Sequence, residues 1–268
     1  LTTATINRWM IVELAFPALV PGLLVTWHYA LQILRPRWGY GSDRGARRTP
    51  WIIGGMFVLA LGGALAAASV GLTASSTILG LSVAFIAFTL IGVGVGASGT
   101  SLLIFLASHV ERERRAAAAT IVWIMMIVGF ILTSAFVGHF LDPFTPLRLV
   151  TLASTICAFA FLISLVAFYR LEPRQKQTSH TQSNSDATKP AFREAFAHVW
   201  RMADARRFAI FVFISMLAYS AQDLILEPFA ALRFDLTPGQ TAALSGTQNG
   251  GVLFGMILVG VLATVFNR

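Results

Sequence analysis

Long apolar stretches, most of them about 20 residues long, divide this sequence into segments separated by short polar or charged turns. A helix of about 20 residues rises about 30 Å, which is the thickness of the hydrocarbon core of a bilayer. The chain is 56% hydrophobic and only 12% charged, whereas a typical soluble domain is about 25% charged. The mean hydropathy is +0.72. These features predict an all-α, multi-pass membrane protein and exclude a soluble domain.

Eight helical segments are expected from the apolar runs and the charged residues between them. The first ends near Glu13, and the others cover residues 16–35, 51–72, 78–108, 117–138, 148–169, 207–228 and 243–266. The chain opens at Leu1 within an apolar pattern, so we expect that its true start is missing. Nothing near the N-terminus is typical of a cleaved signal peptide.

The basic residues predict the orientation of these segments. Seventeen of the 20 Lys and Arg residues lie on one side, in the loops 35–48, 109–115 and 170–207 and at Arg268. The opposite side holds Arg8, Arg148 and Arg233. Basic residues are enriched in cytoplasmic loops, so the first side is predicted to be cytoplasmic. This placement of basic residues beside the membrane accounts for the net charge of +8, so the charge does not indicate a nucleic-acid partner.

A polar stretch at residues 171–189 has no apolar face and predicts a flexible cytoplasmic linker. The following residues, 190–201, place apolar side chains at helical spacing opposite charged ones, which is typical of a helix at the membrane surface. We therefore expect an N-terminal six-helix bundle at 1–170, a linker with an amphipathic helix at 171–206, and the start of a second bundle at 207–268.

The turn after the second span resembles the G-x-x-x-D-R-x-G-R-R loop of the major facilitator superfamily. Its matching residues are Gly39, Asp43, Arg44, Arg47 and Arg48, while Ala46 stands where the family has a second glycine. The resemblance implies that the acidic and basic groups couple helix ends on the cytoplasmic side. An ordinary basic loop with one Asp is the alternative.

A glycine-rich run in the fourth span, Gly94 to Gly99, matches the dinucleotide-binding pattern G-x-G-x-x-G. No strand precedes it, and it lies within an apolar span, so the context contradicts a nucleotide site. Gly92 and Gly96 instead form a face of small residues that allows close helix packing.

Two polar segments form a weak internal repeat, one near the first span and one in the seventh. Each has an amide, a charge, an apolar stretch and a glutamate: Asn7, Arg8 and Glu13 in the first, and Gln222, Asp223 and Glu227 in the second. Charged groups inside a membrane are costly and are usually paired or functional. We expect Arg8 and Asp223 to form an ion pair between bundles; charges that cap helix ends at the interface are the alternative.

Candidate pigment and metal ligands are few. His28 is the one histidine well inside a span, and a neutral imidazole there is a candidate ligand for the magnesium of a chlorophyll; a hydrogen bond between helices is its alternative role. The five histidines and the single cysteine, Cys157, lack the spacing of a metal site. No nucleophile–base pair or phosphate-binding loop predicts catalysis, so we expect no enzyme activity and no metal or nucleotide cofactor.

Three longer stretches resemble the PucC/LhaA group, the bacteriochlorophyll-delivery branch of the major facilitator superfamily in photosynthetic bacteria. They are residues 6–22 (INRWMIVELAFPALVPG), residues 28–55 (HYALQILRPRWGYGSDRGARRTPWIIGG) and residues 221–234 (AQDLILEPFAALRF). The resemblance implies a two-bundle fold of twelve spans, of which about eight are present here. It also implies a place in the bacterial cytoplasmic or intracytoplasmic photosynthetic membrane, with antenna polypeptides and pigment-synthesis or photosynthetic-complex proteins as partners.

The resemblance implies a non-enzymatic factor that assembles light-harvesting complexes and binds bacteriochlorophyll or chlorophyll transiently. A proton-coupled transporter of the facilitator type and a stable accessory subunit of a photosynthetic complex are the alternatives. A delivery factor would present pigment on a lipid-facing wall, because a hydrophobic macrocycle does not enter water. Candidate residues for that wall are Phe85, Phe88, Phe208, Phe211 and Phe213.

Overall fold

The computed structural model describes the chain except residues 1, 36–37, 39–47, 112–113, 170–199 and 267–268. Every element in the described part is helical. The elements are α1 (Thr2–Val12), α2 (Leu19–Ala30), the 3₁₀ helix η1 (Leu31–Leu34), α4 (Thr49–Ser75), α5 (Thr77–His109), α6 (Arg115–Phe140), α7 (Pro146–Phe168), α9 (Ala203–Phe234) and α10 (Pro238–Phe266). Each of the eight predicted segments contains a helix, which confirms the all-α prediction.

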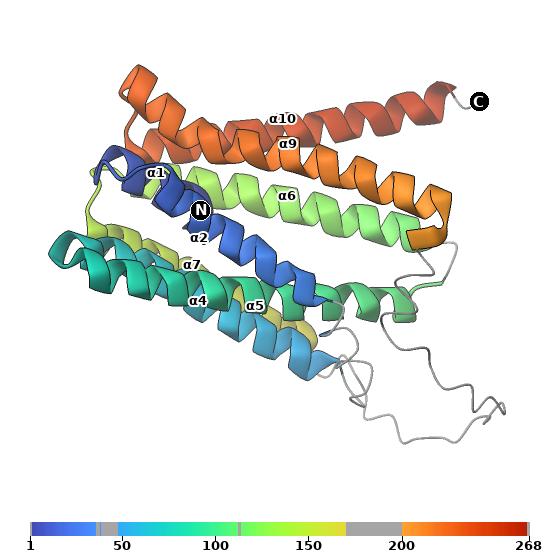
Figure 1. Ribbon diagram of the computed structural model, residues 1–268. Coiled ribbons are helices and arrows are strands. Elements are labelled where there is room, and N and C mark those ends of the chain that lie inside the picture. The colour runs from blue at the N-terminus through green and yellow to red at the C-terminus, as the bar shows by residue number, and fades with distance from the viewer. Residues whose placement is uncertain (1, 36–37, 39–47, 112–113, 170–199, 267–268) are drawn as a thin grey trace.

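Six of the described helices, α4, α5, α6, α7, α9 and α10, are long and apolar enough to cross a membrane by length and composition. They run side by side in Figure 1. Their outer faces carry many exposed large apolar side chains, among them Ile78, Leu147, Val166 and Phe254. A soluble protein would bury most such groups, whereas a lipid-facing surface exposes them. The chain is therefore a multi-pass membrane protein.

The helices pack in two groups joined by α1. In one group α4 lies along both α5 and α7, and α2 packs on α5; in the other, α6 and α9 both contact α10. The short helix α1 contacts α2, α4, α9 and α10. Sequence reasoning assigned α6 to the N-terminal bundle, but its main neighbour here is α10. The facilitator-type two-bundle arrangement and the domain limits stay predictions.

Glycines allow α4 and α5 to approach one another closely. A Cβ atom on Gly94 would lie 2.5 Å from the backbone nitrogen of Leu59, and one on Gly55 would lie 2.6 Å from that of Ser98. Side chains cannot occupy these positions, because each would meet the backbone of the other helix. Gly92 similarly faces Leu31, and Gly96 lies against the ring of Trp38. The predicted small-residue face of the fourth span is thus confirmed.

The start of α10 is fixed by reciprocal hydrogen bonds typical of a capping box. The Thr237 hydroxyl accepts a bond from the backbone N–H of Gln240 (3.2 Å), and the Gln240 side chain accepts one from the N–H of Thr237 (2.9 Å). Pro238, at the first helical position, has no N–H to leave unsatisfied. Asp142, just after α6, accepts bonds from the Thr237 hydroxyl and the Gly239 N–H, and so holds the two helices together.

The predicted boundaries of the last two spans are wrong at the turn that joins them. The predicted seventh span ends at residue 228, but α9 continues through Pro228 to Phe234, and α10 begins at Pro238 rather than at 243. Asp235 ends α9 in a left-handed conformation (φ 53°), which Asp tolerates better than most residues. Pro228 lies inside α9 without ending it, although a proline normally breaks or kinks a helix. A contact from Asn7 of α1 compensates for it.

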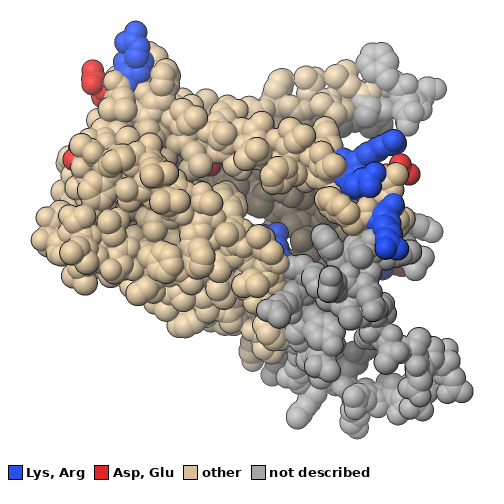
Figure 2. All heavy atoms as spheres, in the orientation of Figure 1, with Lys and Arg blue, Asp and Glu red and all other residues tan. Residues whose placement is uncertain are grey.

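Charged side chains concentrate at the ends of the molecule. Figure 2 shows a mostly uncharged surface between an end with several Lys or Arg residues and an end with fewer. Among the described residues, Arg35 follows η1, Arg48 precedes α4, Arg114 and Arg115 lie at the start of α6, and Arg201, Arg206 and Arg207 lie around the start of α9. The direction in which the chain crosses the membrane stays a prediction from this asymmetry.

Candidate functional site at the meeting of three helices

Asn7 on α1 completes the backbone hydrogen bonding of α9. Pro228 lacks an N–H, so it cannot donate to the carbonyl of Leu224 one turn earlier. The side-chain amide of Asn7 donates to that carbonyl instead, at 2.8 Å. This hydrogen bond replaces the missing backbone bond and explains why α9 continues past Pro228. In membrane helices, carbonyls left without a backbone donor are satisfied by neighbouring side chains. Asn7 is itself buried.

Arg8 lies beside Asn7 and is only 3% exposed. Its guanidinium forms an ion pair with Glu13 (Nη1 to Oε1, 3.1 Å) and donates to the backbone carbonyl of Leu236 at 3.0 Å. Arg8 therefore connects the end of α1 to the turn between α9 and α10. Among the described residues, Arg8 forms its ion pair with Glu13. The predicted ion pair between Arg8 and Asp223 does not form.

Glu227 on α9 is the most buried acidic residue in the described part of the chain, at 2% exposed. One carboxyl oxygen, Oε1, accepts a hydrogen bond from the Ser245 hydroxyl of α10 at 2.7 Å. The charges of Arg8 and Asp223 are both near enough to act on this carboxyl. Glu227 thus lies where α1, α9 and α10 meet.

The remaining members of the predicted polar set lie at the edge of this meeting point. Asp223, one turn before Glu227, is half-buried and lies close enough to Tyr29 of α2 for its charge to act on the phenol. Ser220 of α9 also lies close to the Tyr29 phenol. Gln222 is exposed. The repeat-related segments of α1 and α9 thus pack against one another, although their predicted ion pair does not form.

Sequence reasoning missed the contribution of α10. Its polar residues Thr241, Ser245 and Asn249 recur every four positions, and Gln248 lies beside them. Asn249 donates to the carbonyl of Ser245 at 2.8 Å, and Thr241 is fully buried. A polar stripe at helical spacing in an otherwise apolar span was the signal that could have indicated a buried polar face.

The facilitator-like turn is described only at its end. Gly39, Asp43, Arg44 and Arg47 lie outside the described residues, so the expected contacts of Asp43 stay a prediction. Arg48 is described, and its guanidinium donates to the Ser108 hydroxyl (2.6 Å) and to the carbonyl of Ile104 (3.3 Å). It therefore connects the start of α4 to the end of α5.

His28 has the chemistry of a pigment ligand, but its side chain is buried. Its imidazole is 7% exposed, and Nδ1 has no hydrogen-bond partner among the described residues. A nitrogen of this kind could ligate magnesium if there were open space beside it for a planar macrocycle. The role of His28 as a pigment ligand stays a prediction.

The proposed aromatic wall is partly wrong. Phe208, Phe211 and Phe213 are exposed on α9, as expected. Phe85 is also exposed, and its ring stacks on that of Trp27 with the ring centroids 5.3 Å apart. Phe88 is only 2% exposed and belongs to the apolar core. Different faces of α5 pack against different neighbours. Which face is buried cannot be predicted from the sequence of a span that is apolar on all sides.

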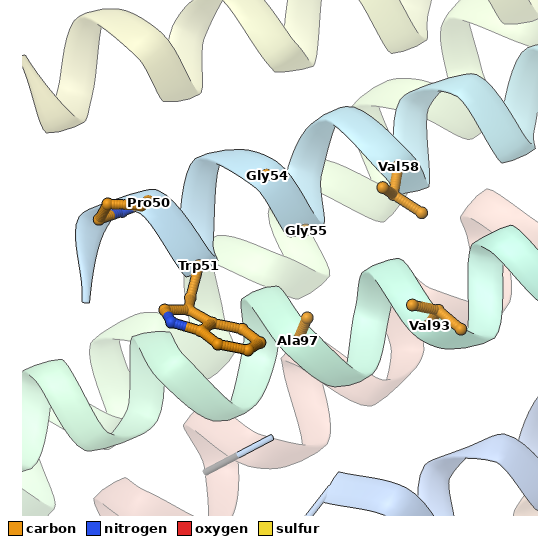
Figure 3. A pocket seen from close by; sticks show the side chains of 7 residues that line it. All are labelled: Pro50, Trp51, Gly54, Gly55, Val58, Val93 and Ala97. Carbon is orange, nitrogen blue, oxygen red and sulfur yellow. The ribbon is translucent and has the colours of Figure 1, made fainter. Parts of the chain in front are cut away.

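Two shallow apolar pockets accompany these features. One, about 330 Å³, lies between α4 and α5, where Trp51 projects beside Gly54, Gly55 and Ala97 (Figure 3). The other, about 380 Å³, lies between α1, α2 and α9, with the polar Asn7 among the apolar residues Ile11, Ile225 and Phe229. No group of three metal-ligating side chains occurs in the part of the chain that the structure describes.

These features define a polytopic membrane protein of the helical type. It has helical spans, lipid-facing apolar surfaces and buried polar groups at one helix junction. The chain belongs to the PUCC protein family, whose model matches residues 5–266. It is 49% identical over 261 residues to the "bacteriochlorophyll synthase 44.5 kDa chain" of Rhodobacter capsulatus, covering 97% of this chain and 60% of that protein.

More distant relatives carry the name "Protein PucC". The protein of Cereibacter sphaeroides is 29% identical over 96% of this chain and 58% of its own length. That of Rhodovulum sulfidophilum is 26% identical over 95% of this chain and 59% of its own length. The chain thus spans about three fifths of the length of the curated relatives it matches. No solved structure matches it.

Proposed function

We propose that this protein is a non-enzymatic factor for the assembly of light-harvesting complexes, and that it handles bacteriochlorophyll within the membrane. The observation that carries the proposal is the match to the PUCC family along almost the whole chain. The Rhodobacter capsulatus relative, named for bacteriochlorophyll synthesis, supports the choice of pigment. Antenna polypeptides are the proposed partners, and bacteriochlorophyll is a transient cargo rather than a resident cofactor.

The exposed aromatic rings of α9 are the proposed contacts for pigment. Phe208 and Phe211 lie on one side of the helix and Phe213 on the opposite side, so a macrocycle could stack on either side without leaving the bilayer. Basic residues Arg206 and Arg207 precede these rings at the start of the helix. His28 has no part in this proposal, because its side chain is buried between helices.

The test is purification of the full-length protein from native photosynthetic membranes, followed by an absorption spectrum and identification of co-eluting chains. We expect bacteriochlorophyll and antenna polypeptides in less than stoichiometric amounts. Replacing Phe208, Phe211 and Phe213 together by Ala should lower the pigment recovered severalfold. Phe159→Ala on α7, which removes an equally exposed ring, is the matched control and should retain it. A pigment-free protein whose deletion leaves antenna levels normal would contradict the proposal.

The name of the Rhodobacter capsulatus relative favours a second candidate, a subunit of an enzyme that makes bacteriochlorophyll. The two candidates differ in what a deletion strain accumulates. Loss of a synthesis subunit should lead to accumulation of a pigment precursor, with all bacteriochlorophyll proteins lowered alike. Loss of an assembly factor should lower one antenna complex while pigment synthesis continues. Extraction of pigments from such a strain distinguishes them.

A further inference from the structure

Buried polar atoms without a hydrogen-bond partner gather where α1, α9 and α10 meet. Within the described residues they are the Thr5 hydroxyl and the Arg8 Nε on α1, the Glu227 Oε2 on α9 and the Gln248 side-chain oxygen on α10. Thr5, Arg8 and Glu227 are all more than nine-tenths buried. In an apolar medium each such atom costs free energy, so four on three adjoining helices require an explanation.

Helical geometry and the observed bonds bring these atoms toward one another. Thr5 and Arg8 are three residues apart and so share a face of α1. Ser245 donates to Glu227, and Gln248 follows Ser245 by three residues on α10. The Arg8 charge acts on the Glu227 carboxyl, which connects the α1 face to the other two helices.

The four atoms form no hydrogen bonds with one another, although they include both donors and acceptors. The Arg8 Nε–H can only donate, the Gln248 oxygen can only accept, and the Thr5 hydroxyl can do both. An ionised Glu227 would be a buried charge with one neutral hydrogen-bond donor, Ser245, and no ion pair among the described residues, which is costly in an apolar medium. Protonation of Oε2 converts that acceptor into a donor, and water can both donate to the amide oxygen and accept from Arg8.

We propose that the junction of α1, α9 and α10 is a hydrated proton-binding site, in which the Glu227 carboxyl takes up and releases the proton. The proton bonds to Oε2, so that the carboxylate becomes a neutral acid, and it returns to water on release. Glu227 lies seven residues before the end of α9, or roughly 10 Å at 1.5 Å per residue. The proton therefore comes from the aqueous phase at that end of the helix.

The charges around the site are few and are placed on different helices. Arg8 on α1 is already paired with Glu13, and Asp223 lies one turn away on α9. Tyr29 of α2 faces Asp223, and α10 contributes the neutral Ser245 and Gln248. Uptake of one proton leaves the Arg8–Glu13 pair facing a neutral group instead of an anion, so the site couples proton binding to the contact between α1 and α9.

Infrared difference spectroscopy of the full-length protein in lipid tests the proposal. As the pH of the medium is stepped, we expect a carboxylic-acid C=O band that shifts in D₂O and is lost in Glu227→Gln. Glu13→Gln and Asp223→Asn are the matched controls and should retain the band. A band that survives Glu227→Gln, or the absence of any such band across the pH range, would overturn the proposal.

A second variant keeps the carboxyl in place in case Glu227→Gln fails to fold. Ser245→Ala removes the one hydrogen bond that Glu227 Oε1 accepts, so the C=O band should move to higher frequency. Gln248→Leu removes a polar partner of the hydrated site and should alter the D₂O shift of the same band. An unchanged band in both variants would overturn the assignment to this site.

Discussion

Two helix contacts in this protein are built in opposite ways. Between α4 and α5, Gly55, Gly62 and Gly94 bring the helix backbones together, and the buried side chains are largely apolar. Where α1 meets α9 and α10, polar side chains connect the helices instead: Asn7 bonds to Leu224, Arg8 to Leu236 and Glu227 to Ser245.

The difference follows from the solvent. Lipid tails are as apolar as leucine, so burying an apolar side chain between membrane helices gains little, and contacts depend on close packing or on hydrogen bonds. Close packing gives a fixed contact that tolerates no added atom. Hydrogen bonds can exchange partners with water or with a proton. We infer that α4 and α5 form the rigid part of the molecule and that the α1–α9–α10 junction is the adjustable part.

The largest effect is expected from adding one methyl group to the packed contact. In Gly94→Ala the new Cβ would lie 2.5 Å from the Leu59 nitrogen and 2.8 Å from the Gly55 carbonyl oxygen. Backbone must move to relieve this overlap, so we expect a loss of about 1–3 kcal/mol of stability, as for overpacked cores. Thermal unfolding of the purified protein in detergent measures it.

Gly99→Ala is the matched control, because it lies on the same helix with no atom within 4 Å of the added Cβ. Its stability should equal or slightly exceed that of the parent, since alanine favours helix more than glycine. Equal stability of the two alanine variants would show that close packing does not hold α4 to α5.

The kind of contact in the rigid region could be predicted from sequence, but its residues could not, and the adjustable region could not be predicted. Glycines repeated within apolar spans indicate close packing, and Gly92 and Gly96 were assigned that role. They pack on Leu31 and Trp38, whereas Gly55, Gly62 and Gly94 make the contact between α4 and α5. The polar residues Asn7, Arg8 and Glu227 were also identified as significant, because ionisable groups are rare in lipid. Their partners depend on how three helices are rotated about their axes, and an apolar span of this kind gives no periodicity from which to derive that rotation.

The misplaced end of α9 has the same origin. Pro228 indicates a helix end when only the local sequence is considered. The amide that compensates for it, on Asn7, is 217 positions away from the carbonyl it satisfies. Only the fold brings the two together.

A smaller effect is expected when the link between α1 and α9 is broken. Asn7→Leu leaves the Leu224 carbonyl without its donor, and hydrogen bonds between membrane helices contribute about 0.6 kcal/mol on average and up to about 1.7. Pro228→Ala restores a backbone N–H that can donate to the same carbonyl. We therefore expect Asn7→Leu to cost less when Pro228→Ala is also present, as measured by a double-mutant cycle of thermal unfolding. Additive effects in that cycle would contradict the compensating role of Asn7.

The smallest effect is expected at the Arg8–Glu13 ion pair, although Arg8 is buried. The Glu13 side chain is 44% exposed, so water already stabilises its charge and competes with the guanidinium. Exposed pairs of this kind contribute about 0–1 kcal/mol, and Arg8 retains its bond to the Leu236 carbonyl when Glu13 is neutralised. Glu13→Gln should therefore lower stability by no more than that amount, and the difference should shrink as salt is added. Glu111→Gln, which removes a largely exposed partner of Arg114, is the matched control for loss of an acidic charge. A much larger, salt-independent loss in Glu13→Gln would show that the charge of Arg8 depends on this one carboxylate, and that the junction is as intolerant of change as the glycine contact between α4 and α5.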